Sequence, residues 1–354
     1  MRKPGTAPQA LAVLTVRNEG AFLLEWLAHH RAVGFTDFLV FSNDCQDGTD
    51  AILDRLQDLG WLTHIRNDGP YEKGGIQFTA LKSAAKTKAY RNADWLLPLD
   101  IDEFVNIHIG DGTLTALLDA LPTATAITLT WRLFGNAGEI RHRDVPITDR
   151  FTKAAPEVIF WPWRAAMFKT LYKNDGTYGK LGVHRPRNPN SDRIENAQWF
   201  DGHGRSLPEQ YKTQRIFSPY GRPNFGLAQL NHYPLGSMES YVLKADRGRA
   251  VHSSDALGLD YWVERNFNTD IDTSISRYAP NRDLHLEELM ADEIIQDLRG
   301  SAVKWRQERF DALMKLESYR ALFGRLLMAP PSHSVTRTAA QFLIQHANIA
   351  NTGH

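Results

Sequence analysis

The sequence predicts an α/β fold in which a mostly parallel central sheet carries helices on both faces, with further helices toward the C-terminus. Three observations predict it. Short apolar runs alternate with segments of helical periodicity four times in the first hundred residues. The runs lack the polar–apolar alternation of half-exposed strands, which is typical of strands covered on both faces. Parallel strands need crossover connections, and a helix after each strand supplies them.

The first 110 residues contain the expected strand–helix units. The strands are expected at residues 10–16, 38–41, 61–65 and 95–99, and the helices at 21–33, 51–59 and 76–92. Apolar residues recur at helical spacing from Phe22 to Leu27, and Gly34 ends that helix because glycine adopts the left-handed C-cap conformation. The polar loop at 42–50 ends in an N-cap for the next helix.

Beyond residue 110 the pattern changes. We expect a helix at 114–121, a strand at 126–132 and a short strand at 165–168; residues 135–235 otherwise form loops and a small mixed sheet that complete a cleft. Further helices are expected at 237–250, 284–298 and 302–327. Residues 1–110 and 111–250 are thus expected to be two halves of one domain, and residues 251–354 a helical extension.

Composition excludes several classes of protein. The 41 Lys and Arg residues balance the 41 Asp and Glu residues, so the chain lacks the positive field that binds nucleic acid. The single cysteine, Cys45, excludes a disulfide framework and a multi-cysteine zinc site. No apolar run approaches the roughly 18 residues that span a bilayer, and the first ten residues do not resemble a signal peptide. We therefore expect a cytoplasmic protein without a transmembrane segment.

The most informative segment is the apolar run Trp95–Leu99 followed by Asp100-Ile101-Asp102-Glu103-Phe104. Alternation along an extended chain places Asp100 and Asp102 on the same side. Two carboxylates at the end of a buried strand need a cation, and Mg2+ or Mn2+ shared with substrate phosphates suits such oxygen ligands. The segment therefore predicts a metal and a phosphorylated substrate at the carboxyl edge of the sheet.

Three segments resemble the motifs of family-2-like glycosyltransferases, which have the GT-A fold. Residues 14–19 (LTVRNE), 42–49 (SNDCQDGT) and 100–104 (DIDEF) occur in that family's order and spacing, each after an expected strand. Residues 230–233 (LNHY) and the basic segment 244–249 resemble a bacterial branch of these enzymes. The usual second motif has adjacent acidic residues, whereas here an asparagine precedes the first aspartate, which leaves open which acid meets the nucleotide base.

The resemblance implies a metal-dependent enzyme of polysaccharide biosynthesis that moves a sugar from a nucleoside diphosphate, preferably a UDP-sugar, to a hydroxyl of a glycan or glycolipid. Mn2+ or Mg2+ would hold the diphosphate and stabilise the departing group. The implied donor-binding residues are Val16, Arg17, Asn18, Glu19, Asn43, Asp44, Lys82, Asp100, Lys244, Arg247 and Arg249. The implied metal ligands are Asp100, Asp102 and His232. A lipid-linked acceptor would allow peripheral membrane contact, and the oligomeric state stays open.

Several of these residues have a purely structural alternative. Asn18 is equally suited to capping the turn after the first strand, and residues 47–49 to an Asx turn at a helix start. Lys82, and the basic group of Lys244, Arg247 and Arg249, also fit solvated helix faces. His184 competes with His232 as a metal ligand, or else lines the acceptor pocket.

The catalytic base and the acceptor contacts are less defined. An inverting enzyme needs a carboxylate near the acceptor hydroxyl, and Asp201, Glu239 and Glu139 are the candidates. The aromatic faces of Trp131, Trp161 and Trp163 suit sugar stacking, with Trp163 the expected acceptor contact beside His184; core packing is the commoner use of any single tryptophan.

Three other functions also use or retain paired aspartates, and features of the sequence distinguish the first two from a glycosyltransferase. A phosphatase normally carries Asp-x-Asp after its first strand, whereas here it follows the fourth. A nucleotidyltransferase needs a glycine-rich basic loop after the first strand, and residues 17–20 contain a single glycine. An inactive carbohydrate-binding relative would bind a donor without turnover.

Overall fold

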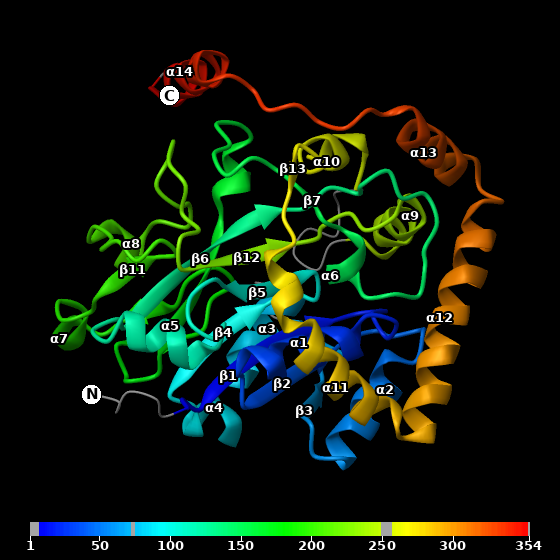
Figure 1. The fold of residues 1–354 in the computed structure, drawn as a ribbon, viewed down its shortest axis with the longest axis horizontal. Coiled ribbons are helices and arrows are strands. Elements are labelled where there is room, and N and C mark those ends of the chain that lie inside the picture. Colours follow the sequence, from blue (N-terminus) through cyan, green and yellow to red (C-terminus); the bar gives the residue numbers. More distant parts are fainter. Residues whose placement is uncertain (1–6, 72–74, 249–256, 353–354) are drawn as a thin grey trace.

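The structure, a computed structural model, describes residues 7–71, 75–248 and 257–352. At its centre, the described residues form a nine-stranded sheet of order β3-β2-β1-β4-β8-β6-β12-β5, with β11 paired to β6 (Figure 1). The strands are β1 (Ala10–Val16), β2 (Asp37–Ser42), β3 (Thr63–Arg66), β4 (Trp95–Leu99), β5 (Glu103–Ile107), β6 (Ala126–Leu133), β8 (Phe168–Lys173), β11 (Trp199–Asp201) and β12 (Ala228–His232). Strands from both sides of residue 110 therefore share one sheet.

The sheet is mostly parallel, as predicted. Strands β1 to β4 pair in parallel, and β12 and β11 run parallel to β6. β8 runs antiparallel to its neighbours β4 and β6, and β5 antiparallel to β12. The carboxyl ends of β1, β2 and β4 consequently meet at one edge.

Both faces of the sheet are covered. The covering elements of the first half are α1 (Leu23–Val33), α2 (Thr49–Asp58), α3 (Ile76–Ala84), α4 (Lys88–Asn92) and α5 (Leu114–Ala120). Leu14 of β1 belongs to the same apolar cluster as Trp26 of α1, whereas its neighbour Val13 belongs to a second cluster with Leu81 of α3. Alternate side chains of one strand thus enter opposite cores, which explains why its sequence is apolar throughout.

The helices differ from the expected ones at two positions, where one side chain caps the N-terminus of a helix that was not predicted to begin there. The expected helix 76–92 is two helices, because Thr87 Oγ1 accepts a hydrogen bond from Tyr90 N at 3.2 Å and begins α4. Asp292 likewise caps α12, its Oδ1 accepting from Ile295 N at 3.0 Å. The expected helices 284–298 and 302–327 are instead α11 (Ala279–Met290), α12 (Glu293–Leu313) and α13 (Glu317–Met328).

The remaining elements within residues 135–235 are short, as expected, and further elements follow beyond residue 235. They are α6 (Ile147–Arg150), β7 (Lys153–Ala154), η1 (Trp163–Ala166), β9 (Tyr178–Lys180), β10 (Arg187–Pro189), α7 (Ser191–Ile194), α8 (Gln210–Thr213), α9 (Met238–Arg247), α10 (Leu259–Val263), β13 (Asp270–Ile271), η2 (Ser274–Tyr278) and α14 (Arg337–Thr352). The strand expected at 165–168 is the end of η1 followed by the start of β8.

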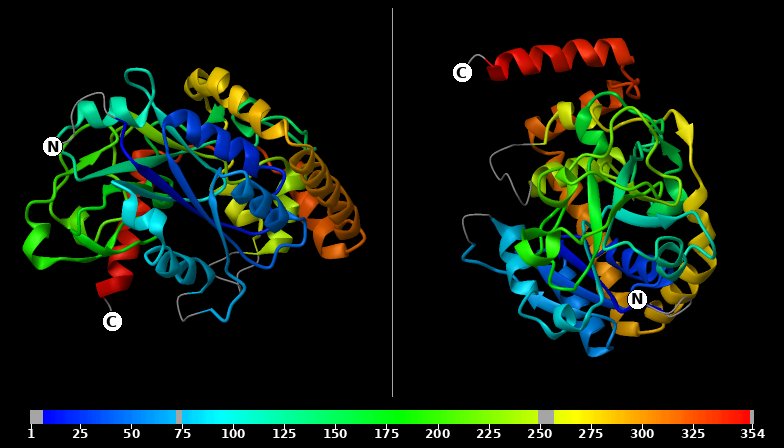
Figure 2. Two further views of the ribbon diagram at one scale, coloured as in Figure 1. Left: turned by 90° about the horizontal axis from the view of Figure 1, so that it is seen from below. Right: turned by 90° about the vertical axis from the view of Figure 1, so that its left-hand side faces the viewer.

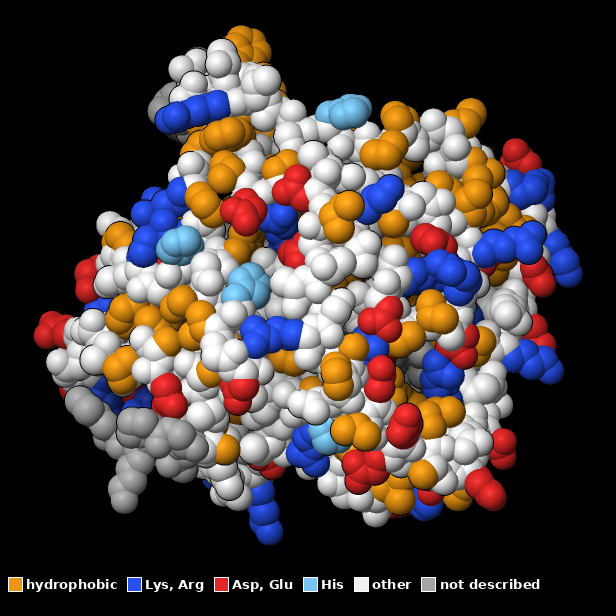
Figure 3. Space-filling view, in the orientation of Figure 1, with side chains coloured by type: hydrophobic (Ala, Val, Ile, Leu, Met, Phe, Trp, Pro, Cys, Tyr) orange, Lys and Arg blue, Asp and Glu red, His pale blue; other side chains and the backbone are white. Residues whose placement is uncertain are grey.

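The C-terminal helices wrap the edge of the molecule. α11 packs on α1, and α12 packs on both α2 and α9. α14 extends away from the sheet and lies apart from the main body in the right-hand view of Figure 2. On the face shown in Figure 3, acidic and basic side chains are interspersed. Within the described ranges, none of the helices is long and apolar enough to cross a membrane.

Candidate functional site

A cleft of about 480 Å³ opens at the carboxyl edge of the sheet. Val16 and Asn43, which lie at the ends of β1 and β2, line it together with Asp100 and Asp102, which follow β4. His232, the last residue of β12, also lines this cleft. The first half of the chain and residues beyond 230 therefore meet in one cavity at the carboxyl edge of the sheet.

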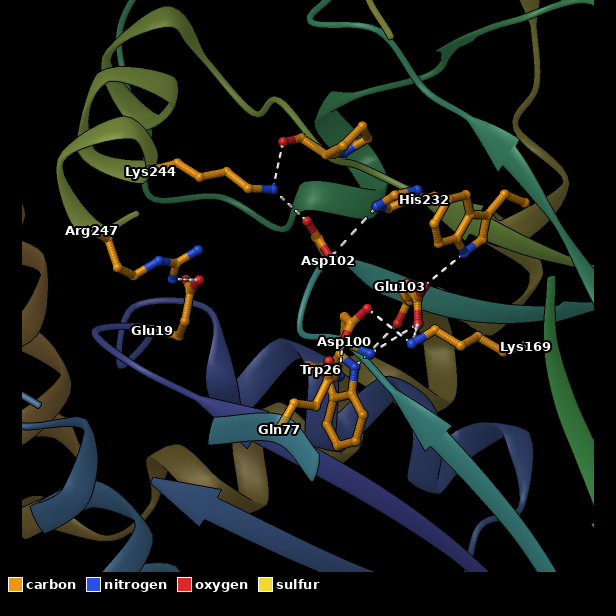
Figure 4. A network of polar contacts seen from close by, with 12 residues as sticks. Glu19, Trp26, Gln77, Asp100, Asp102, Glu103, Lys169, His232, Lys244 and Arg247 are labelled. Atoms are coloured by element: carbon orange, nitrogen blue, oxygen red, sulfur yellow. Dashed lines mark hydrogen bonds and ion pairs between the residues drawn. The ribbon is translucent and has the colours of Figure 1, made fainter. Parts of the chain in front are cut away.

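Asp102 lies between a lysine and a histidine (Figure 4). Its Oδ2 accepts a hydrogen bond from Lys244 Nζ at 2.7 Å, and its Oδ1 lies 3.7 Å from His232 Nε2. Burial acts to raise the pKa of Asp102, but the charge of Lys244 and the contact with His232 bring this pKa well below its ordinary value. Asp102 is therefore ionised throughout the neutral range.

The sheet register places His232. β12 pairs with β5 so that His232 lies opposite Glu103, and the His232 ring lies 4.4 Å from the Trp131 ring of β6. Burial lowers the pKa of His232, so its imidazole is neutral at pH 7. Its Nδ1 has no hydrogen-bond partner in the described part of the chain. A neutral, buried imidazole beside a carboxylate has the chemistry of a metal ligand.

Asp100 belongs to a different set of contacts, centred on Lys169. Lys169 is fully buried in β8, and its Nζ lies 2.9 Å from Asp100 Oδ2 and 3.4 Å from Glu103 Oε2. Asp100 Oδ1 accepts from Gln77 Nε2 at 3.1 Å. Sequence reasoning did not identify Lys169, although a lysine inside the buried run 168–172 signals an acidic partner, since a lone buried ammonium is unfavourable.

Glu103 turns back toward the protein. Its Oε2 accepts from Asp100 N at 2.9 Å, and its Oε1 from Trp131 Nε1 at 2.7 Å. Burial raises the pKa of Glu103 to about 8; Lys169 opposes this rise, and the charges of Asp100 and Asp102 add to it. Glu103 thus orients its neighbours and does not face the cleft as a ligand.

Arg247 closes one side of the cleft. Its Nη1 forms an ion pair with Glu19 and donates to the carbonyl oxygen of Arg17 at 2.9 Å, which ties the end of α9 to the turn after β1. Burial and the nearby charges of Arg306 and Arg17 lower the pKa of Arg247 to about 10. Lys244 and Arg247, three positions apart on α9, thus both face the cleft, whereas Arg249 lies outside the described residues.

These side chains could hold a divalent ion whose remaining ligands come from a substrate. Asp102 and His232 face one another, but Asp100 is turned toward Lys169 and Gln77, so the three expected ligands do not converge on one point. Among the described residues, no group of three or more His, Cys, Asp or Glu side chains could hold a metal. Mg2+ commonly takes one or two carboxylates and completes its coordination with phosphate oxygens and water, and Asp102 with His232 is close to that pattern.

The three expected catalytic bases do not lie in the cleft. Asp201 is fully buried, and its Oδ2 accepts from Arg205 Nε at 2.9 Å while its Oδ1 stabilises the turn after β11. Glu239 Oε2 accepts from the backbone N–H of His142 at 2.8 Å. Glu139 forms ion pairs with Arg143 and Arg150. Each of the three carboxylates is paired within local structure, and none lines the described cleft.

Some of the expected donor-binding residues lie outside the cleft lining. Val16, Arg17 and Asn43 line the cleft as expected. Asn18 Oδ1 accepts from Gln46 N at 2.7 Å and so joins the loops after β1 and β2. Asp44 accepts a hydrogen bond from the Tyr71 hydroxyl at 3.1 Å and, like Lys82, does not line the cleft.

Trp131 and His184 also line the cleft. His184 Nδ1 donates to the carbonyl oxygen of Phe168 at 3.0 Å, and burial lowers its pKa to about 4. Trp163 is 42% exposed, its ring lies 4.7 Å from that of Trp161, and neither residue lines the cleft. The expectation for Trp163 is therefore corrected. The cleft residues that sequence reasoning missed include Arg164, Met167 and Arg265, which lack a distinctive motif.

Comparisons with known proteins identify relatives. Residues 13–202 match the family described as glycosyltransferase family 92. The chain is 25% identical over 109 residues to a family 92 protein of Ricinus communis, which covers 30% of this chain and 19% of that protein. It is 27% identical over 150 residues to a family 92 protein of Oryza sativa subsp. japonica, and the aligned region covers 40% of this chain and 24% of that protein. The chain thus spans about a fifth to a quarter of these relatives' lengths.

Solved structures also show similarity. A mannosyltransferase from Pyrobaculum calidifontis, solved in complex with GDP-Man and Mn2+, is 13% identical with a TM-score of 0.34, and the similarity covers 92% of this chain and 88% of that one.

The matched segment exceeds half of the 354 residues and runs from β1 to β11, including Asp100 and Asp102. The resemblance of the three motifs to family-2-like enzymes therefore indicated the right class of protein but a different family. The chain belongs to glycosyltransferase family 92.

Proposed function

We propose that this protein transfers a sugar from a nucleoside diphosphate donor, preferably a UDP-sugar, to a hydroxyl of a glycan or glycolipid, with Mn2+ or Mg2+ as cofactor. The observation that carries the proposal is the meeting of Asp102, His232 and Lys244 at the edge where the parallel strands end. Membership of a glycosyltransferase family supports the class of reaction.

The nucleoside would lie along the ends of β1 and β2, against Val16, Arg17 and Asn43. Asp100, held by Lys169 and Gln77, keeps its carboxylate at the cleft, where a ribose hydroxyl can donate to it. Fixing this carboxylate in advance favours binding, because less side-chain freedom is lost when the donor arrives.

The diphosphate would lie between Asp102 and α9. Asp102 and His232 would hold the ion, which when bound supplies positive charge to the departing nucleoside diphosphate. Burial acts to lower the pKa of Lys244, but Asp102 raises it above its ordinary value, so Lys244 stays charged. Lys244 orients Asp102 and, with Arg247, places two cationic side chains beside the phosphates.

The acceptor would enter the part of the cleft lined by Trp131 and His184. Glu103 fixes the Trp131 ring through its 2.7 Å hydrogen bond. A fixed aromatic face suits the apolar face of a sugar ring. The acids of the described cleft lining are Glu19, Asp100 and Asp102, and each is paired with a basic side chain.

The proposal is tested by calorimetric titration of UDP, GDP, CDP and ADP with and without Mn2+. One diphosphate should bind the wild type in the micromolar range with Mn2+, and Asp102→Asn should weaken this binding at least about tenfold, since it removes a charged ligand. Asp58→Asn, an exposed acid at the end of α2, is the matched control and should bind like the wild type.

His232→Gln distinguishes the contribution of the metal ion to the affinity from that of the nucleotide contacts. It should lose the Mn2+-dependent part of the affinity and retain the part measured without metal. If none of the diphosphates binds under any metal condition, or if folded Asp102→Asn binds as the wild type does, the proposed function is wrong.

A further inference from the structure

A second pocket lies behind the ion pairs that wall the cleft. It has a volume of about 80 Å³. The residues that line both cavities are Glu19, Ile101, Asp102, Lys244 and Arg247. The rest of its lining comes mainly from Phe22, the segment 142–151, residues 233–246 and two residues of α12, Trp305 and Arg306. Much of this pocket therefore lies beyond the segment that matches the family.

Arg306 projects from α12 into this pocket. It is only 6% exposed, its guanidinium lies 4.5 Å from the centre of the Phe22 ring, and its Nη2 donates to Ser240 Oγ at 3.0 Å. Its Nε is buried without a hydrogen-bond partner within the described ranges. The protein therefore leaves part of this buried guanidinium unsatisfied, which costs free energy unless another group binds there.

The pairing of the other charged groups leaves the charge of Arg306 only partly compensated. The acids that line the pocket in the described structure are Glu19, Asp102 and Asp246, and each is already paired, with Arg247, Lys244 and Arg309 respectively. Burial lowers the pKa of Arg306 to about 10, and Asp47 and Glu239 offset this only in part. A buried guanidinium without an anion is unfavourable.

His142 supplies a second polar group without a partner. Its ring lines the pocket, and its Nε2 is buried without a hydrogen-bond partner among the described residues. Burial and the charge of Arg306 lower the pKa of His142 to about 4, so the ring is neutral at pH 7. A neutral imidazole can donate one hydrogen bond through Nε2 to an anion without adding charge.

We propose that this pocket is a binding site for a small oxyanion, a phosphate or carboxylate group, with Arg306 as its principal ligand. The planar guanidinium matches the geometry of such oxygens. The volume of about 80 Å³ admits a group of this size and is far smaller than the cleft of about 480 Å³. The bound anion would face Arg247 from the side opposite the cleft and reduce the repulsion between Arg247 and Arg306.

Calorimetric titration with inorganic phosphate, and separately with acetate, tests this proposal in chloride buffer of constant ionic strength. The wild type should bind at least one of the two anions, and binding of neither would show the proposal to be wrong. Arg306→Met should weaken binding of the preferred anion at least about tenfold, since a charged hydrogen bond is lost. Lys304→Met is the matched control, because Lys304 lies on the same helix with an exposed side chain.

Arg306→Lys distinguishes direct contact from an effect of charge alone. It keeps the charge but lacks the planar fork, so it should also bind the anion more weakly than the wild type. Binding unchanged in either folded Arg306 variant, or equally weakened in Lys304→Met, would overturn the proposal. The titration uses no sugar nucleotide, so its outcome is independent of the proposed transferase activity.

Thermal unfolding without phosphate or acetate supplies a second criterion. Arg306→Met should unfold no lower than the wild type, because it removes a buried charge that is only partly compensated. Phosphate or acetate should then raise the Tm of the wild type but not that of the variant. A variant that unfolds well below the wild type without the anion would show that Arg306 is retained for structure, and the proposal would fail.

Discussion

Lys169 shows how one buried charge organises the acids of the cleft. It lies fully buried between Asp100 and Glu103, and without it both acids would lie close to Asp102 with no counter-charge from β8. The shorter contact is with Asp100, at 2.9 Å against 3.4 Å for Glu103. Since burial raises the pKa of Glu103 to about 8, Lys169 mainly compensates Asp100 at neutral pH.

Glu103→Gln should therefore remove a pH dependence of stability. The folded protein retains a proton on Glu103 up to about pH 8, whereas the unfolded chain releases it near 4.5. The free energy of unfolding of the wild type should consequently fall as the pH rises between these values, by at most about 1.4 kcal/mol per pH unit from this group. Urea denaturation at pH 5, 6.5 and 8 should show the variant gaining on the wild type as the pH rises.

The exposed Glu317→Gln provides the control for that experiment, since its side chain is 84% exposed. Its curve should follow the wild type at each pH. Parallel curves for Glu103→Gln and the wild type would contradict the raised pKa.

At the scale of the element, α9 carries both cationic side chains of the cleft, and Ser237 fixes where that helix begins. Ser237 Oγ accepts a hydrogen bond from Ser240 N at 3.2 Å. Ser237→Ala should lower the free energy of unfolding by about 1 kcal/mol, because the helix loses its cap. Chemical denaturation measures this, and Ser237→Asp, which keeps an acceptor, should lose less. Equal losses in the two variants would contradict a capping role.

The sequence was a good guide to elements whose signal is local. The strands at 10–16 and 95–99 were predicted with correct bounds, because strands buried on both faces need apolar residues throughout. The helix breaks before α4 and α12 were missed, because one capping residue interrupts a helical pattern that continues beyond it.

The candidate site was predictable only in part. Asp100 and Asp102 were found because they follow a strand, but their lysine partners are 69 and 142 residues away along the chain. Such pairings depend on sheet order and helix packing, which no local pattern contains. Asp201 was misjudged for the same reason, because its flanking aromatic residues gave no sign of its buried contact with Arg205.

Across the molecule, α12 connects the N-terminal half of the fold with its later part, since it packs on α2 and on α9. Arg55 of α2 forms an ion pair with Asp292, and Arg309 of α12 forms one with Asp246 of α9. α14, in contrast, extends away from the sheet (Figure 2).

Deletion of residues 337–354 should therefore leave the fold and nucleotide binding intact. We expect the free energy of unfolding to change by no more than about 1 kcal/mol, since few buried contacts are lost. Deletion from residue 293 onward, which also removes α12, should abolish cooperative unfolding. Circular dichroism during thermal unfolding measures both, and a large loss from the shorter deletion would contradict this division.

The separation of Asp100 and Asp102 from their lysine partners has a consequence for synthesis. The N-terminal strands leave the ribosome first, and they carry both acids before Lys169 and Lys244 have been translated. A nascent chain that ends before β8 therefore presents two uncompensated carboxylates at the edge of a sheet that still lacks β8, the strand between β4 and β6. The charge balance of the cleft is therefore established only after α9 has emerged, well after the sheet edge itself has been synthesised.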